Sequence, residues 1–214
     1  MRPAPNLPAR FLRFFFYLIY QPLAWSYDLV AWLVSLGQWK FWILSPLPWL
    51  TGPRVLELGH GPGHLQVALH QNALHAFGLD QSRQMGILAR RRLRKAGFHG
   101  ALSGGIAQHL PFPAKTFDQV VATFPSEYII HEDTLANIRR VLRPGGTLIV
   151  LPVAWIRSQR PFGRLAAWLF RVTGQAEAWS GLFSEKFRNA GFLVEEKRIM
   201  FPDSELVLLV ANCQ

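Results

Sequence analysis

Residues 54–63, which read RVLELGHGPG, decide the fold of this chain. A short apolar run carries an acid, Glu57, and glycines follow at the alternate positions 59, 61 and 63. From Leu65 onward apolar residues recur at helical spacing, so the stretch predicts a strand, a tight turn and the start of a helix. Because glycine has no Cβ atom, such a backbone can approach a ligand closely, and the first N–H groups of the helix face whatever lies in the turn.

Several ligand classes use a strand, a glycine turn and a helix. A phosphate-binding loop would require a lysine that is missing here, and the dinucleotide motif requires a glycine where this chain has His64. The pattern that remains is E-x-G-x-G-x-G. The next predicted strand, residues 75–80, ends in Asp80, and an acid at that place can accept hydrogen bonds from ribose hydroxyls.

Three further segments make this pattern more specific. Residues 80–85 read DQSRQM, residues 110–121 contain LPFP and FDQVV, and residues 141–148 read VLRPGGTL. Together with the two acids and the glycines, they resemble the class I S-adenosylmethionine-dependent methyltransferases over roughly residues 51–151. The chain is similar in particular to the branch of ubiquinone and menaquinone methylases and bacterial phospholipid N-methyltransferases, whose N-terminal Y-D pair resembles Tyr27-Asp28.

The resemblance implies S-adenosylmethionine as cofactor and S-adenosylhomocysteine as product. One position departs from the family, because Ile106 stands where an acid usually accepts a hydrogen bond from the adenine amino group. We therefore expect weaker or less selective cofactor binding, with adenine held by backbone groups, by Gln108 or by packing. The cofactor-binding residues implied are Glu57, Gly59, His60, Gly61, Gly63, Asp80, Gln81, Met85, Ile106, Ala107, Gln108 and Thr123.

Composition limits the alternatives. The 214 residues suit one domain with a small appendage, and the single cysteine, Cys213, excludes a disulfide framework or a cysteine zinc site and favours a reducing, cytoplasmic location. His60 and His64 are interpreted as loop residues near the cofactor, and no metal site is expected. The net charge of +10 suggests nucleic acid, an anionic membrane surface or an acidic substrate as partner, and nucleic acid is disfavoured because no recognisable RNA-binding appendage accompanies the charge. The basic run at residues 90–95 is interpreted as charge at a helix C-terminus.

The first 50 residues differ from the rest, with tryptophans at 25, 32, 39, 42 and 49 and an aromatic run at 14–20. A signal peptide lacks its cleavage site, and a membrane-spanning helix is interrupted by polar and charged residues. Amphipathic helices at about 9–20, 23–36 and 39–42 remain, either in a membrane interface, as a cap over the substrate pocket, or at an oligomer interface. An insert at about 154–180 is expected to add a basic amphipathic helix.

Methyl transfer needs alignment more than it needs an obligatory catalytic side chain. The resemblance places acceptor-facing residues after the fourth strand, where Glu127, Tyr128 and His131 are candidates to take a proton or position the acceptor; alternatively, Glu127 caps the next helix. Candidate substrate contacts are Tyr27, Trp32, Phe124 and Trp155.

The fold expected is α/β, a Rossmann-like doubly wound sheet of about seven mostly parallel strands that ends in an antiparallel hairpin. N-terminal amphipathic helices (1–50) would precede the methyltransferase domain (51–214). The leading hypothesis is a methyltransferase acting on a phospholipid amine or an isoprenoid quinone at a membrane surface. A soluble small-molecule O- or N-methyltransferase and a non-catalytic cofactor-binding relative are the alternatives.

Overall fold

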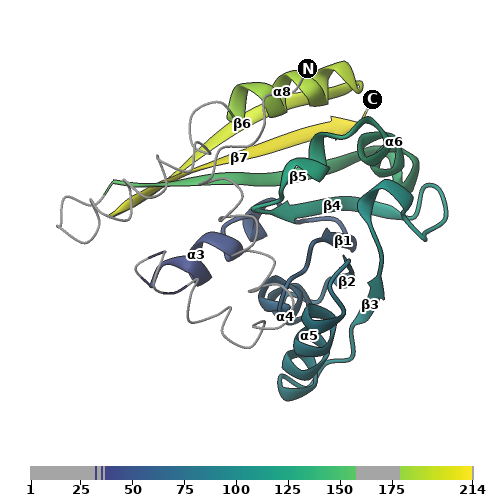
Figure 1. Ribbon diagram of the computed structural model, residues 1–214, viewed down its shortest axis with the longest axis vertical. Coiled ribbons are helices and arrows are strands. Elements are labelled where there is room, and N and C mark those ends of the chain that lie inside the picture. Colours follow the sequence, from purple (N-terminus) through teal and green to yellow (C-terminus); the bar gives the residue numbers. More distant parts are fainter. Residues whose placement is uncertain (1–31, 33–34, 36, 158–178, 214) are drawn as a thin grey trace, which may run out of the picture.

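The computed structural model describes residues 32, 35, 37–157 and 179–213. Within these ranges, seven strands form one sheet in the order β3-β2-β1-β4-β5-β7-β6 (Figure 1). β1 to β5 are parallel, and β7 runs antiparallel to both of its neighbours. The predicted α/β fold is thus confirmed. The strands are β1 (Arg54–Leu58), β2 (His75–Asp80), β3 (Ala101–Gly104), β4 (Phe117–Thr123), β5 (Leu142–Ile156), β6 (Phe192–Phe201) and β7 (Ser204–Cys213).

Helices cover both faces of the sheet, as crossovers between parallel strands require. On one face α6 (Glu132–Val141) and α8 (Trp179–Asn189) bury Ile138 and Phe183. On the other, α3 (Trp39–Leu44) and α4 (His64–Gln71) bury Trp42 and Leu65, and α5 (Arg83–Lys95) contacts α4. Single 3₁₀ turns η2 (Leu47–Trp49), η3 (Ala107–His109) and η4 (Glu127–Ile130) complete the described elements.

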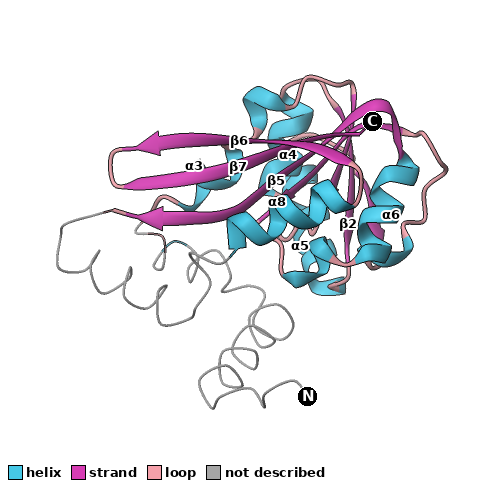
Figure 2. Ribbon diagram, turned by 90° about the horizontal axis from the view of Figure 1, so that it is seen from above, coloured by secondary structure: helices cyan, strands magenta, loops and turns pink. Residues whose placement is uncertain are grey.

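The C-terminal hairpin is longer than the two strands, 193–199 and 205–211, that the sequence pattern predicts. β6 and β7 pair from Phe192 opposite Cys213 to Phe201 opposite Ser204, around a turn at residues 202–203. With the end of β5 they form a three-stranded arm that reaches beyond the shorter strands (Figure 2). The hairpin itself is confirmed.

Two expectations about β5 change. The insert was expected to begin near residue 154, but β5 continues to Ile156 because Ala154 and Trp155 pair with β7. Residues 158–178 lie outside the described ranges, as do Tyr27 and the first predicted helix. The Pro144-Gly145 pair, whose residue types favour a turn, lies within the start of β5 at a register shift against β4, and Gly145 has a positive φ of 74°.

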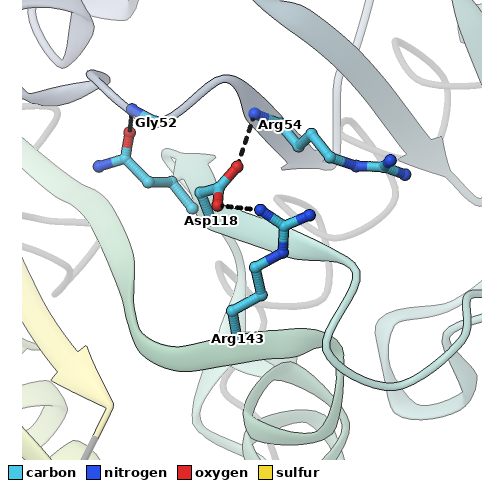
Figure 3. A network of polar contacts seen from close by, with 5 residues as sticks. Gly52, Arg54, Asp118 and Arg143 are labelled. Carbon is cyan, nitrogen blue, oxygen red and sulfur yellow. Dashed lines mark hydrogen bonds and ion pairs between the residues drawn. The ribbon is translucent and has the colours of Figure 1, made fainter.

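At the amino ends of the parallel strands, polar side chains of β4 form hydrogen bonds with the segment that leads into β1 (Figure 3). The Asp118 carboxylate accepts from the backbone N–H of Arg54 at 2.9 Å and from Arg143 Nη1 at 2.6 Å. The Gln119 side chain accepts from the Gly52 N–H at 2.7 Å and donates to the carbonyl of Trp49 at 2.8 Å. This edge therefore fixes the register between the linker, β1, β4 and β5.

Candidate active site

The carboxyl end of β1 continues into the glycine turn, residues 59–63. Gly59, Gly61 and Gly63 all have positive φ, at 68°, 51° and 84°, which side chains with a Cβ rarely adopt. A Cβ on Gly63 would stand 2.8 Å from that of Ala89, and one on Gly59 would stand 3.0 Å from the hydroxyl of Tyr128. At Gly61, by contrast, no described atom lies within 4 Å of the Cβ position. The turn is packed at both ends and has open space at its centre.

The acid at the end of β2 faces this turn. The Asp80 carboxylate accepts from the Gly61 N–H at 2.9 Å and from the Ser82 N–H at 2.8 Å. Ser82 then caps α5, since its hydroxyl accepts from the Met85 N–H at 3.3 Å; a serine directly before a helix is typical of this role, and the run DQSRQM predicts it. A half-buried carboxylate with remaining acceptor capacity therefore lies beside the turn.

The acid of β1 lies in a drier place. Glu57 is 2% exposed and accepts from the Gln66 side-chain amide of α4 at 2.8 Å; in the described ranges no cation forms an ion pair with it. Burial raises the pKa of Glu57 to about 8, the amide of Gln66 opposes this shift and the negative charge of Asp80 adds to it. The geometry thus holds a carboxyl group that is ready for a cationic partner.

His60 is also buried, at 3% exposure. Its Nδ1 lies 2.7 Å from the carbonyl oxygen of Gly61, and its Nε2 finds no hydrogen-bond partner among the described residues. Burial lowers the pKa of this imidazole, although the charge of Asp80 acts in the opposite direction. A neutral imidazole therefore presents one unsatisfied ring nitrogen within the turn.

A pocket opens between the glycine turn, the start of α5 and the end of β3. Of the predicted cofactor residues, it brings together His60, Asp80 and Gln81. Met85 is a fully buried residue of α5. The predicted residues that do not line this pocket are Met85, Glu57, Gly59, Gly61, Gly63, Ile106, Ala107, Gln108 and Thr123. Ile106 is 43% exposed, Ala107 is buried, and the backbone carbonyl of Gln108 accepts from Asn137. The lining residues are His60, Asp80, Gln81, Ser82, Arg83, Gly86, Arg90, Ser103, Gly104 and Gly105.

The segment after β4 reaches the same edge of the sheet. Thr123 ends β4 beside Leu151, and Phe124 follows with φ of 48°, a strained conformation for a bulky residue. The Phe124 ring stacks on Trp39 of α3, with centroids 4.9 Å apart. Strain of this kind persists only where the surroundings hold it, and the stack together with the bond from the Phe124 N–H to the Leu151 carbonyl provides that restraint.

The three candidate catalytic residues are separated. Tyr128 points back to the end of β1, where its hydroxyl donates to the Leu58 carbonyl at 3.3 Å and adjoins Gly59. Glu127 and His131 are exposed, and His131 rather than Glu127 occupies the N-cap position of α6. Tyr128 is thus the member of the trio that the fold brings to the glycine turn.

The predicted substrate contacts also divide. Phe124 lies in the aromatic stack, whereas Trp155 packs on the opposite face of the sheet with the α6–α8 core. Trp32 is 57% exposed, and Tyr27 lies outside the described residues. Sequence reasoning missed Gln66, the amide partner of Glu57, and the long-range bond from Trp42 Nε1 to the Ser204 hydroxyl at 2.9 Å. The one available sequence signal for Gln66 was its position on α4: it lies about one helical turn before Leu69 and so on the buried side of the helix.

Comparison with known proteins agrees with this geometry. A family model described as "Methyltransferase domain" matches residues 55–146. The chain is 29% identical over 201 residues to the ubiquinone/menaquinone biosynthesis C-methyltransferase UbiE of Ralstonia nicotianae, covering 87% of this chain and 78% of the relative. It is 30% identical over 182 residues to the demethylmenaquinone methyltransferase of Symbiobacterium thermophilum, covering 79% and 68%.

Solved structures share the fold at lower identity. A Thermotoga maritima protein described as an S-adenosylmethionine-dependent methyltransferase superposes with a TM-score of 0.60 at 19% identity, over 92% of this chain and 99% of that one. The geranyl diphosphate C-methyltransferase of Streptomyces coelicolor gives 0.59 at 14% identity, over 76% and 74%. The relatives, the matched domain and the glycine turn with its acids place this chain in the class I S-adenosylmethionine-dependent methyltransferases.

Proposed function

We propose that the protein methylates the ring of an isoprenoid quinone at a membrane surface. As a family member it uses S-adenosylmethionine, so the open points are the residues that hold the cofactor and the acceptor. The relatives named above are quinone methyltransferases. The stacked rings of Trp39 and Phe124, called the aromatic wall below, are consistent with such an acceptor.

The residues of the glycine turn fit this cofactor. Gly61 leaves open space for a ligand, Asp80 offers carboxylate oxygens to sugar hydroxyls, and Glu57 offers a buried carboxyl group to the amino group of the methionine part. When bound, the cofactor supplies an electrophilic methyl group on a sulfonium centre. The protein has to orient both reactants and exclude water.

The observation that carries the acceptor class is the stack of Trp39 on Phe124. It lies directly after β4, at the edge of the sheet that carries the glycine turn and Asp80. A wall of two aromatic rings suits a flat, apolar ring that stacks on it. Phe124 and Trp39 are therefore proposed to orient the acceptor, while Tyr128 holds the boundary between the acceptor and the turn.

A quinol ring that gains a methyl group must lose a proton. Two titratable side chains that follow the aromatic wall in sequence are Glu127 and His131, and both are exposed. Either group can accept the proton once the acceptor covers this rim. We retain them as candidate bases and assign Tyr128 a positioning role.

The membrane part of the proposal rests on exposed aromatic side chains, one of them on α3, and on charge. Phe41 and Trp32 are 63% and 57% exposed, and the net charge of +10 favours an anionic surface. None of the helices in the described ranges combines enough length and apolar character to cross a bilayer. In this proposal, exposed aromatic and basic residues make the contact with the membrane surface.

The test uses purified protein, S-adenosylmethionine and anionic liposomes that contain a demethylated menaquinol. We expect the quinol to gain the mass of one methylene group and the protein to float with the vesicles. Methylation of phosphatidylethanolamine instead of the quinol would overturn the proposed acceptor, and methylation of a short-chain quinol with no flotation would overturn the membrane part. Replacing Phe41 with serine should weaken flotation but leave turnover of a short-chain quinol unchanged.

A further inference from the structure

The glycine turn has the most permissive backbone of the site, and it is also the segment on which the cofactor is proposed to bind. Three residues with positive φ lie within five positions, and glycines lose more conformational freedom on ordering than other residues. A ligand that binds to such a turn must order it unless the protein has already done so. A contact within the protein that holds the turn in place would therefore lower the entropic cost of ligand binding.

One helix contacts the turn through two residues of the same face. Ala89 of α5 packs against Gly63 so closely that a Cβ on the glycine would stand 3.0 Å from the Ala89 Cα atom. Three residues later, the Nη1 of Arg92 donates to the carbonyl oxygen of Pro62, a buried residue. Positions three apart lie side by side on a helix. α5 therefore contacts the turn at two adjacent points, by packing at Ala89 and by a hydrogen bond at Arg92.

The Arg92 bond fixes the orientation of one peptide plane. In a trans peptide the carbonyl of Pro62 and the N–H of Gly63 point in opposite directions. The carbonyl is held by Arg92, and the Gly63 N–H donates back across the turn to the His60 carbonyl at 3.0 Å. If this plane rotated, both bonds would break, and His60 and Gly61 would lose their place beside Asp80.

We propose that Arg92 is a positioning residue for the cofactor: it orders the glycine turn from outside the site, so that S-adenosylmethionine binds to a backbone that is already arranged. The inference rests on the proposed assignment of this turn to the cofactor. It also gives the basic run of α5 a specific role. Its neighbours Arg90 and Arg91 are both exposed, and Arg90 donates to the Leu102 carbonyl at 3.1 Å.

The primary test is calorimetric titration of the full chain with S-adenosylhomocysteine. Arg92→Ala should weaken binding about tenfold, mainly through a less favourable entropy, because a bond from a charged donor is lost and the turn must order on binding. Arg92→Lys keeps one charged donor and should recover part of the loss. Arg91→Ala is the matched control, since it removes the same charge one residue away, and should bind like the unaltered protein.

A second measurement needs no ligand. Hydrogen exchange of the backbone amides at residues 59–65 should be faster in Arg92→Ala than in Arg91→Ala, while exchange in β4 and β5 stays the same. Equal affinities and equal exchange in these two variants would overturn the inference. Failure of the unaltered protein to bind S-adenosylhomocysteine, together with faster exchange in Arg92→Ala, would instead reject the proposed cofactor site and leave Arg92 as the residue that orders the turn.

Discussion

The two ends of the parallel strands carry acids with opposite surroundings. At the amino ends, Asp118 accepts from a backbone N–H and from the guanidinium of Arg143. At the carboxyl ends, Glu57 is buried against a neutral amide, and within the described part of the chain Asp80 accepts from backbone N–H groups of the turn and of the residue that caps α5. The first arrangement compensates its charge within the fold. The second leaves acidic groups that a ligand with hydroxyl and ammonium groups can satisfy.

Backbone geometry differs between the two edges in how positive φ angles are grouped. At the carboxyl edge, Gly59, Gly61 and Gly63 lie within one turn, and the strained Phe124 follows β4. Such conformations cost free energy and tend to gather where a ligand is bound. At the amino edge, positive φ angles are spread over separate turns, at Ala73, Lys115 and Gly145. The cluster of positive φ angles beside two acids therefore distinguishes the carboxyl edge.

The largest effect is expected from the pH dependence of Glu57. Its pKa rises from 4.5 to about 8 in the folded protein, so between these values the folded state holds a proton that the unfolded state has released. The free energy of unfolding should then fall as pH rises through this window, by about 1.4 kcal/mol per pH unit from this group. Urea unfolding across the window should show a flatter profile for Glu57→Gln, and identical profiles would show that Glu57 is not a buried, neutral acid.

Asp80→Ala should weaken the binding of S-adenosylhomocysteine about 100-fold, because a charged acceptor for sugar hydroxyls and for two amides is removed. Calorimetric titration measures the loss. Asp80→Asn keeps one acceptor oxygen and should lose less. Unchanged affinity in Asp80→Ala would contradict the binding role that the comparison gives to the carboxyl edge.

Asp118→Ala should have the complementary result. The free energy of unfolding should fall by about 2 kcal/mol, since the Arg54 N–H loses a charged acceptor and Arg143 loses its partner. Chemical denaturation gives the loss of stability, and affinity for S-adenosylhomocysteine at a temperature where the variant is folded should match that of the unaltered protein. Weaker binding of S-adenosylhomocysteine with unchanged stability would show that the amino edge takes part in binding, which contradicts the comparison.

The smallest effect concerns a contact on the arm that serves structure alone. Ser204 accepts from Trp42 Nε1 at 2.9 Å and donates to the Gln38 side chain at 2.8 Å, in a buried position. Ser204→Ala should lower stability by about 1 kcal/mol through the unpaired indole N–H. Thermal unfolding checks this, and a loss in cofactor affinity would mean that α3 is coupled to the glycine turn.

The sequence was sufficient for features that depend on local pattern. The alternating glycines, the acid ending β2, the Ser82 cap and the C-terminal hairpin could be predicted because each follows from a few neighbouring residues. The fold class followed from the alternation of strands and helices.

Contacts across long separations could not be predicted in this way. Phe124 stacks on Trp39, and Tyr128 donates to Leu58, because the β4 segment returns to the end of β1 in space. The basic run of α5 was interpreted as a charged helix end, yet Arg92 bonds to the carbonyl of Pro62, 30 positions away. A sequence pattern does not specify which arginine of such a run faces inward, since that depends on how α5 is rotated against the turn.

The central claim is that the carboxyl edge of the sheet binds the cofactor between its two acids. A crystal structure of the protein with S-adenosylhomocysteine tests it most directly. The account predicts ribose hydroxyls on the Asp80 carboxylate, the amino group of the homocysteine part beside Glu57, and the ligand backbone over Gly61. A ligand bound elsewhere, with Asp80 still bonded to Gly61 and Ser82 and Glu57 still sealed against Gln66, would contradict it.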